Sequence, residues 1–144
     1  MQGRFSFAAR LVREGAMVNV SFRDLPDCLT FGKGMRDALR MAEDCLDEGI
    51  AARIASGENI PMPSRPRAGE RLVALPPQTA AKAALCLALR EAGVSKSELA
   101  RRLGCDEKEI RRMLDPHYGT KLPRLHRALV ALGKRLEIDL RDAA

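Results

Sequence analysis

The sequence predicts an α+β domain followed by an all-α domain. Three observations support this: the first part of the chain alternates with the period of a β-strand, residues 35–55 repeat with the period of a helix, and helical patterns fill the chain beyond Pro76-Pro77. A chain of 144 residues has room for two small domains. We therefore expect an antiparallel sheet with one long helix in residues 1–75 and a helix-turn-helix domain in residues 76–144.

The sheet is predicted from short segments in which polar and apolar residues alternate. Residues 4–13 and residues 17–22 favour a hairpin because the turn signal Glu14-Gly15 lies between them. A loop is expected over residues 24–28, and a short third strand over residues 29–31.

The long helix is predicted from apolar residues that recur three and four positions apart. These residues are Met35, Ala38, Leu39, Ala42, Leu46, Ile50 and Ile54. Gly57 ends the pattern, and the prolines at positions 61, 63 and 66 exclude a helix or a central strand after it. A fourth strand is expected over residues 71–75.

The second domain begins and ends with predicted helices over residues 79–92 and 122–136. Between them, the segment from Ser95 to Leu114 reads as a helix-turn-helix. Ser95 and Asp106 are predicted to cap its two helices, each with a glutamate three residues later that completes a capping box, and Gly104 provides the turn. The predicted inward residues are Leu99, Ala100, Leu103, Ile110, Met113 and Leu114.

The outward face of the second helix of this motif carries side chains suited to DNA. Lys108, Arg111 and Arg112 suit phosphates or a guanine edge, whereas Glu107 fits only as an acceptor from cytosine. The competing interpretation is a plain structural hairpin with the same glycine turn. The candidate DNA-binding residues are Ser95, Lys96, Glu107, Lys108, Arg111, Arg112, His117, Tyr118 and Lys121.

Charge is distributed unevenly along the chain. Residues 78–144 carry 14 Lys and Arg against 9 Asp and Glu, whereas residues 1–77 carry 11 against 10. The positive excess therefore lies in the half that contains the helix-turn-helix, as binding to phosphates requires.

Catalysis, metal binding and cofactor binding are not expected. The cysteines form no CxxC pair, and His117 and His126 do not complete a zinc-ligand spacing. The loop after the second strand offers only Asp24 and Asp27 as acids for a nuclease site, and no Ser/His/Asp set, P-loop or GxGxxG is present. Since no apolar run approaches 18 residues, we expect a cytoplasmic protein with free thiols. The cysteines are Cys28, Cys45, Cys86 and Cys105.

Several segments follow one another in a recognisable order: the paired strands, the loop Phe22-Arg-Asp-Leu-Pro-Asp-Cys28, Gly32, the helix with Ala38 and Ala42, and the exit Ile60-Pro-Met-Pro-Ser64. In this order they resemble the HicB antitoxins. The tail from Leu114 to Leu136 is similar to the helix-turn-helix extension of one branch of that family. The resemblance covers nearly the whole chain.

The resemblance implies a toxin-binding domain and a DNA-binding domain. The first would have a partial ribonuclease H fold without its catalytic set and would bind a small basic ribonuclease toxin of the HicA type. The second would bind the operator of its own operon. The chain lacks the usual Tyr-Pro opening, and it has Arg23 where the family usually has Pro and Asp27 where it usually has Gly. We therefore expect the loop after the second strand to differ in shape.

Four carboxylates on the long helix are candidate toxin-binding residues: Glu43, Asp44, Asp47 and Glu48. Such a cluster would attract a basic RNA-binding partner and speed its encounter. A helix also needs a solvated polar face, for which Asp and Glu serve well, and this interpretation stays open.

The sequence therefore predicts an antitoxin that represses its own operon as a dimer or larger assembly. Its expected partners are the basic toxin, operator double-stranded DNA and a second copy of the chain. One alternative is a stand-alone helix-turn-helix regulator whose α+β domain dimerises or senses a ligand. Another is a binding module with a degenerate nuclease fold and no role on DNA.

Overall fold

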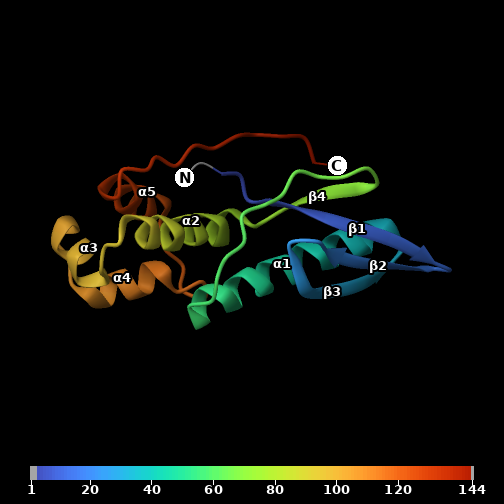
Figure 1. Ribbon diagram of the computed structural model, residues 1–144, viewed down its shortest axis with the longest axis horizontal. Helices are drawn as coiled ribbons and strands as arrows, with labels where there is room; N and C mark the ends of the chain where they lie inside the picture. Colours follow the sequence, from blue (N-terminus) through green and yellow to red (C-terminus); the bar gives the residue numbers. More distant parts are fainter. Residues whose placement is uncertain (1–2, 144) are drawn as a thin grey trace.

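A four-stranded antiparallel sheet occupies one end of the molecule and a group of helices the other (Figure 1). The computed structural model describes residues 3–143. The strands are β1 (Ser6–Glu14), β2 (Met17–Phe22), β3 (Leu25–Lys33) and β4 (Glu70–Ala74), in the spatial order β3-β2-β1-β4. The prediction of an α+β region followed by helices is confirmed.

The hairpin of β1 and β2 forms as the alternation predicts. Glu14 pairs with Met17 across a two-residue loop, and Gly15 has a φ of +61° there. Glycine is favoured at this position because a side chain would strain a positive φ in so tight a turn.

The third strand is longer than predicted, and the expected loop over residues 24–28 is wrong from Leu25 onward. Phe22 pairs with Leu25 across the two-residue turn Arg23-Asp24, and the register is irregular between Ser21 and Phe22. Pro26 disfavours a central strand because it has no backbone N–H. It is tolerated because β3 lies at the edge of the sheet, where a missing N–H need not break a ladder bond.

Helix α1 (Gly34–Ser56) covers one face of the sheet and packs mainly against β3. The approach is close because Gly32 of β3 lies under the first turn of the helix: a Cβ atom at Gly32 would stand 2.3 Å from the backbone nitrogen of Ala38. The fully buried side chains of this first core include Phe7, Val18, Leu25, Leu46 and Ile50.

Four further helices build a second core. They are α2 (Pro77–Ala92), α3 (Lys96–Leu103), α4 (Glu107–Leu114) and α5 (Leu122–Ala131). Helix α2 joins the two cores, since Ala83 and Cys86 belong to the first and Leu85 and Ala88 to the second. The two ends of the molecule therefore share one helix.

The last helix is shorter than predicted. It ends at Ala131 rather than Leu136, because Leu132 closes it and Gly133 takes a φ of +77°. Leu136 still packs on the second core. The segment that follows runs back past α2 toward the sheet, where Asp139 lies 3.8 Å from Arg4 (Figure 1).

None of the helices within residues 3–143 combines the length and apolarity that a membrane crossing needs.

Candidate functional site

Helices α3 and α4 begin at the predicted caps. The Ser95 hydroxyl accepts a hydrogen bond from the Glu98 N–H at 3.1 Å, and the Asp106 carboxylate accepts one from the Glu109 N–H at 3.0 Å. Gly104 closes α3 with a φ of +67°. Each cap satisfies an N–H group that the helix itself leaves unpaired.

The carboxylates of Glu98 and Glu109 do not complete the predicted capping boxes. Glu98 instead binds Arg101 and Arg102 on its own helix, and Glu109 binds Arg124 of α5. Charge-assisted bonds to guanidinium groups are strong and occupy these carboxylates, so neither reaches back to the N–H of its cap residue. The two arginines lower the pKa of Glu98 to about 2.

The two helices pack through the small and aliphatic residues that the spacing predicts. Leu99, Ala100, Ile110 and Met113 are buried in the second core. Because these residues face inward, the polar row of α4 faces away from the molecule.

The outward row of α4 contains one carboxylate that is paired internally. Glu107 accepts from the Ser97 hydroxyl at 3.0 Å and forms an ion pair with Arg111 at 3.1 Å. The bond to Ser97 joins the first turns of α3 and α4. Together the two contacts explain a glutamate on a helix face that was predicted to contact DNA. Lys108 is exposed and makes no ion pair with any residue of the described chain.

The connection between α4 and α5 lies beside the end of α4. The Arg112 guanidinium stands 5.4 Å from the centre of the Tyr118 ring, a cation–π distance, and the ring is 45 % exposed. The His117 N–H donates to the Asp115 carboxylate at 2.9 Å, and Lys121 is exposed at the start of α5.

The candidate DNA-binding residues therefore fall into two neighbouring groups. Ser95 and Lys96 lie at the start of α3, which Ser97 connects to the start of α4. At the other end of α4, Tyr118 lies beside Arg112, and the N–H of His117 binds the Asp115 carboxylate.

Sequence reasoning missed Lys82 on α2. Its side chain is fully buried, and its ammonium group donates to three backbone carbonyls and one hydroxyl near the end of α4. Burial lowers the pKa of Lys82. The sequence does indicate a special role for this residue, because Lys82 is the one charged residue within a run of small and aliphatic residues from position 80 to position 89.

The four candidate toxin-binding carboxylates do not share one environment. Glu43, Asp44 and Glu48 are exposed on α1, and Asp44 lies 3.9 Å from Arg40. Asp47 is half-buried, and one of its oxygens has no hydrogen-bond partner among the described residues. Three of the four carboxylates thus form an accessible acidic surface on α1, far from α4 in the sequence.

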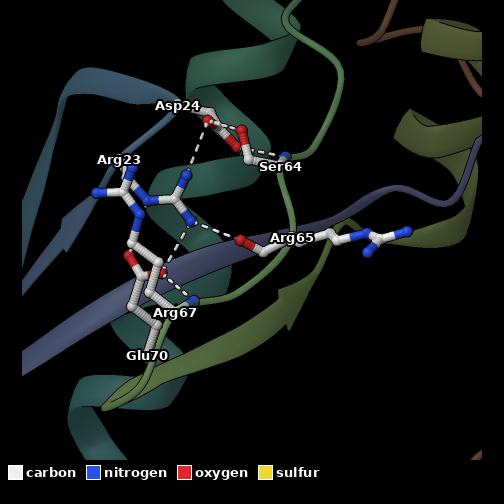
Figure 2. Close-up of polar contacts among 6 residues, drawn as sticks. All are labelled: Arg23, Asp24, Ser64, Arg65, Arg67 and Glu70. Atoms are coloured by element: carbon white, nitrogen blue, oxygen red, sulfur yellow. Dashed lines mark hydrogen bonds and ion pairs between the residues drawn. The ribbon is translucent and has the colours of Figure 1, made fainter.

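Arg23 lies at the centre of a polar cluster at the turn between β2 and β3 (Figure 2). Its guanidinium donates to both carboxylate oxygens of Glu70, at 2.8 and 3.1 Å, and to the carbonyl of Arg65 at 2.8 Å. Beside it the Asp24 carboxylate accepts from the N–H and the hydroxyl of Ser64. The pKa of Glu70 falls to about 2, first because of Arg23 and then because of the Arg67 N–H.

Asp27, the other residue noted as a departure from the resembled family, is also paired. Its carboxylate accepts from Arg53 of α1, and this bond lowers the pKa of Asp27. Arg23 thus links the turn to Glu70 of β4 and to the segment before that strand, and Asp27 links β3 to α1.

Within residues 3–143 no three His, Cys, Asp or Glu side chains come together as a metal site. The four cysteines are free thiols, and burial raises the pKa of Cys28 to about 11.

Comparison with known proteins identifies the family. Residues 6–84 match the family described as HicB-like antitoxin of a bacterial toxin–antitoxin system. Antitoxin HicB of Escherichia coli strain K12 is 34% identical over 119 residues, 83% of this chain and 86% of the relative. Antitoxin HicB 2 of Photorhabdus laumondii is 38% identical over 119 residues, 83% of this chain and 84% of the relative. Antitoxin HicB of Pseudomonas fluorescens is 32% identical over 143 residues, 96% of each chain. The chain belongs to the HicB-like antitoxins.

Proposed function

We propose that this antitoxin neutralises a small basic toxin ribonuclease of the HicA type with its first domain and represses its own operon with its second. The family match is the observation that carries the antitoxin role. A regulatory, non-catalytic family agrees with the expectation that the chain is not an enzyme. We place the domain boundary between residues 75 and 76, just before α2, and assign the first domain a partial ribonuclease H fold.

The operator-binding half of the proposal rests on the surface of α4. The acids of this region are paired with arginines or used as caps: Glu98 with Arg101, Glu107 with Arg111, and Asp106 at the start of α4. Lys108 and Arg112 are exposed and have no carboxylate partner in the described part of the chain. We therefore assign α4 as the recognition helix of a helix-turn-helix. A dimer would present two such helices to a two-fold operator.

Operator binding is tested with a duplex taken from upstream of the chain's own gene and a scrambled duplex of the same composition. Arg112→Ala should weaken binding to the upstream duplex by roughly 10- to 100-fold if Arg112 reads a guanine edge. Lys108→Ala should weaken binding to both duplexes alike and reduce the salt slope by about one. The control is Arg10→Ala, which removes an exposed arginine on β1 and should leave the affinity for both duplexes unchanged. Equal affinity of the wild type for both duplexes would contradict the operator role.

The toxin-binding half rests on the accessible acidic surface of Glu43, Asp44 and Glu48. Negative charge attracts a basic partner over distances near the Debye length. Reversing Glu43, Asp44 and Glu48 to lysine should slow association with the basic toxin by roughly tenfold at low salt, with a smaller effect at high salt. Glu14→Lys on β1 is the control. An unchanged association rate would exclude this surface as the toxin site.

A further inference from the structure

Two side chains one turn apart on α2 hold the connection between α4 and α5. Gln78 and Lys82 are four residues apart and so lie on the same face of the helix. Both side chains bind the same segment, residues 115–120, although it lies 33 residues from Lys82 and 42 from Gln78 at the bonded positions.

Lys82 makes the larger share of these contacts. Its ammonium nitrogen lies 3.0 Å from the Arg112 carbonyl and 2.6 Å from the Asp115 carbonyl, and it also donates to the Tyr118 carbonyl and, at 3.0 Å, to the Thr120 hydroxyl. None of the four acceptors is a carboxylate. The charge is offset by carbonyl dipoles at the C-terminal end of α4, where a cation is favoured.

Gln78 fixes the far side of the same segment. Its side-chain carbonyl accepts from the Thr120 N–H at 2.9 Å. Thr120 is therefore held twice, by its N–H and by its hydroxyl, from a single face of α2.

Hydrophobic packing does not favour a lysine at position 82. The neighbouring buried positions of α2 are occupied by alanine, leucine and cysteine, which bury no charge. Burying an ammonium group is unfavourable unless every proton finds an acceptor, and here the three protons have four acceptors, one at the end of α4 and three in residues 115–120. The arrangement selects one position of that segment relative to α4.

The segment held in this way carries Tyr118, whose ring lies against the Arg112 guanidinium. The carbonyl groups of both residues are bound by Lys82, one at the end of α4 and one in the connection. We propose that Gln78 and Lys82 are positioning residues for DNA recognition, which hold Tyr118 so that it orients Arg112 toward the groove. This inference rests on the proposed operator binding.

The test compares variants of the full chain on the upstream and scrambled duplexes, at a temperature where circular dichroism shows each variant folded. Lys82→Met should weaken binding to the upstream duplex by roughly tenfold and Gln78→Ala by about threefold, because a loosened support misplaces the contacting group. The ratio of the two affinities should fall in both variants. A loss of stability alone would not change that ratio, and Leu46→Ala in the first core is the matched control for it.

A double variant separates positioning from any other effect. If Lys82 acts through Arg112, the Lys82→Met/Arg112→Ala chain should bind no more weakly than Arg112→Ala alone. Full additivity, or an unchanged affinity ratio in folded Lys82→Met, would overturn the inference. Should Lys82→Met not fold, Gln78→Ala and Thr120→Val decide the question in the same assay. If the wild type shows no preference for the upstream duplex, the proposed operator binding fails first and the inference with it.

Discussion

The two ends of this antitoxin differ in the groups that hold their distant segments together. At the sheet end, ion pairs join segments far apart in sequence: Arg23 pairs with Glu70, and Arg53 with Asp27. At the helical end most pairs are local, three or four residues apart, as between Glu98 and Arg101 or Glu107 and Arg111. Distant segments there are joined by Lys82 and Gln78, which bind backbone groups, and by the ion pairs of Arg124 with Glu109 and of Lys134 with Glu91.

The difference follows from the backbone structure of the segments that each end must keep in place. The proline-containing segment between α1 and β4 has no regular structure of its own, so its position depends on side chains such as Arg23 and Asp24. The helices satisfy their own backbone groups, and their acids are free to neutralise neighbouring arginines. The selective pairing at the helical end leaves Lys108 and Arg112 without carboxylate partners among the described residues, which is the pattern a phosphate-binding surface needs.

The largest effect should come from removing a fully buried leucine from either core. Leu46→Ala and Leu85→Ala should each lower the free energy of unfolding by about 2–5 kcal/mol, because each leaves a cavity. Urea unfolding followed by circular dichroism measures the loss. Only Leu85→Ala should also weaken binding to the upstream duplex, since Leu46 lies in the other core. Equal effects on DNA binding would show that the two ends do not act separately.

A smaller and more local effect is expected from Arg23→Ala. Loss of the guanidinium frees the Arg65 carbonyl and leaves Glu70 without its main partner. The segment before β4 should open more often, and trypsin should cleave after Arg67 about three- to tenfold faster. Arg40→Ala, which breaks an exposed pair with Asp37, serves as the control and should leave cleavage unchanged. Equal cleavage rates in wild type and Arg23→Ala would mean that the cluster does not hold this segment.

The pair of Arg23 and Glu70 should also depend on pH. The pKa of Glu70 is lowered to about 2 in the folded protein from an ordinary value of 4.5, so the folded state favours the ionised carboxylate. Its stabilising contribution is complete above pH 4.5 and is lost as pH falls toward 2. The difference in Tm between wild type and Glu70→Gln should therefore be larger at pH 7 than at pH 3. A difference independent of pH would exclude an ionic contribution.

The smallest effect on stability is expected at Glu107. Its ion pair with Arg111 is exposed, so Glu107→Gln should change the free energy of unfolding by no more than about 0.5 kcal/mol. The variant frees Arg111 and removes a negative charge from the proposed DNA surface. Binding to both duplexes should tighten by about two- to fivefold at low salt, with little change in their ratio. Tighter binding to the upstream duplex alone would instead indicate that Glu107 reads a base.

Local patterns predicted much of the fold. The β1–β2 hairpin, the long helix and the caps at Ser95 and Asp106 are all set by residues within one or two turns of each other. The predicted loop before β3 and the overlong α5 were wrong where position in the fold outweighs local preference. Pro26 is acceptable in a strand only because that strand is at an edge.

The sequence by itself determined the family, the positive excess in the second half of the chain, and the faces that α3 and α4 bury and expose. Those properties depend on residue type and on the spacing of residues along the chain. Only the tertiary structure decided the partners of individual charges. It pairs Glu107 with Ser97 and Arg111, joins Arg23 to Glu70, and aims Lys82 at the end of α4. These contacts span up to 47 residues, and a hydrogen bond over such a separation is fixed by how helices and strands pack rather than by any local pattern.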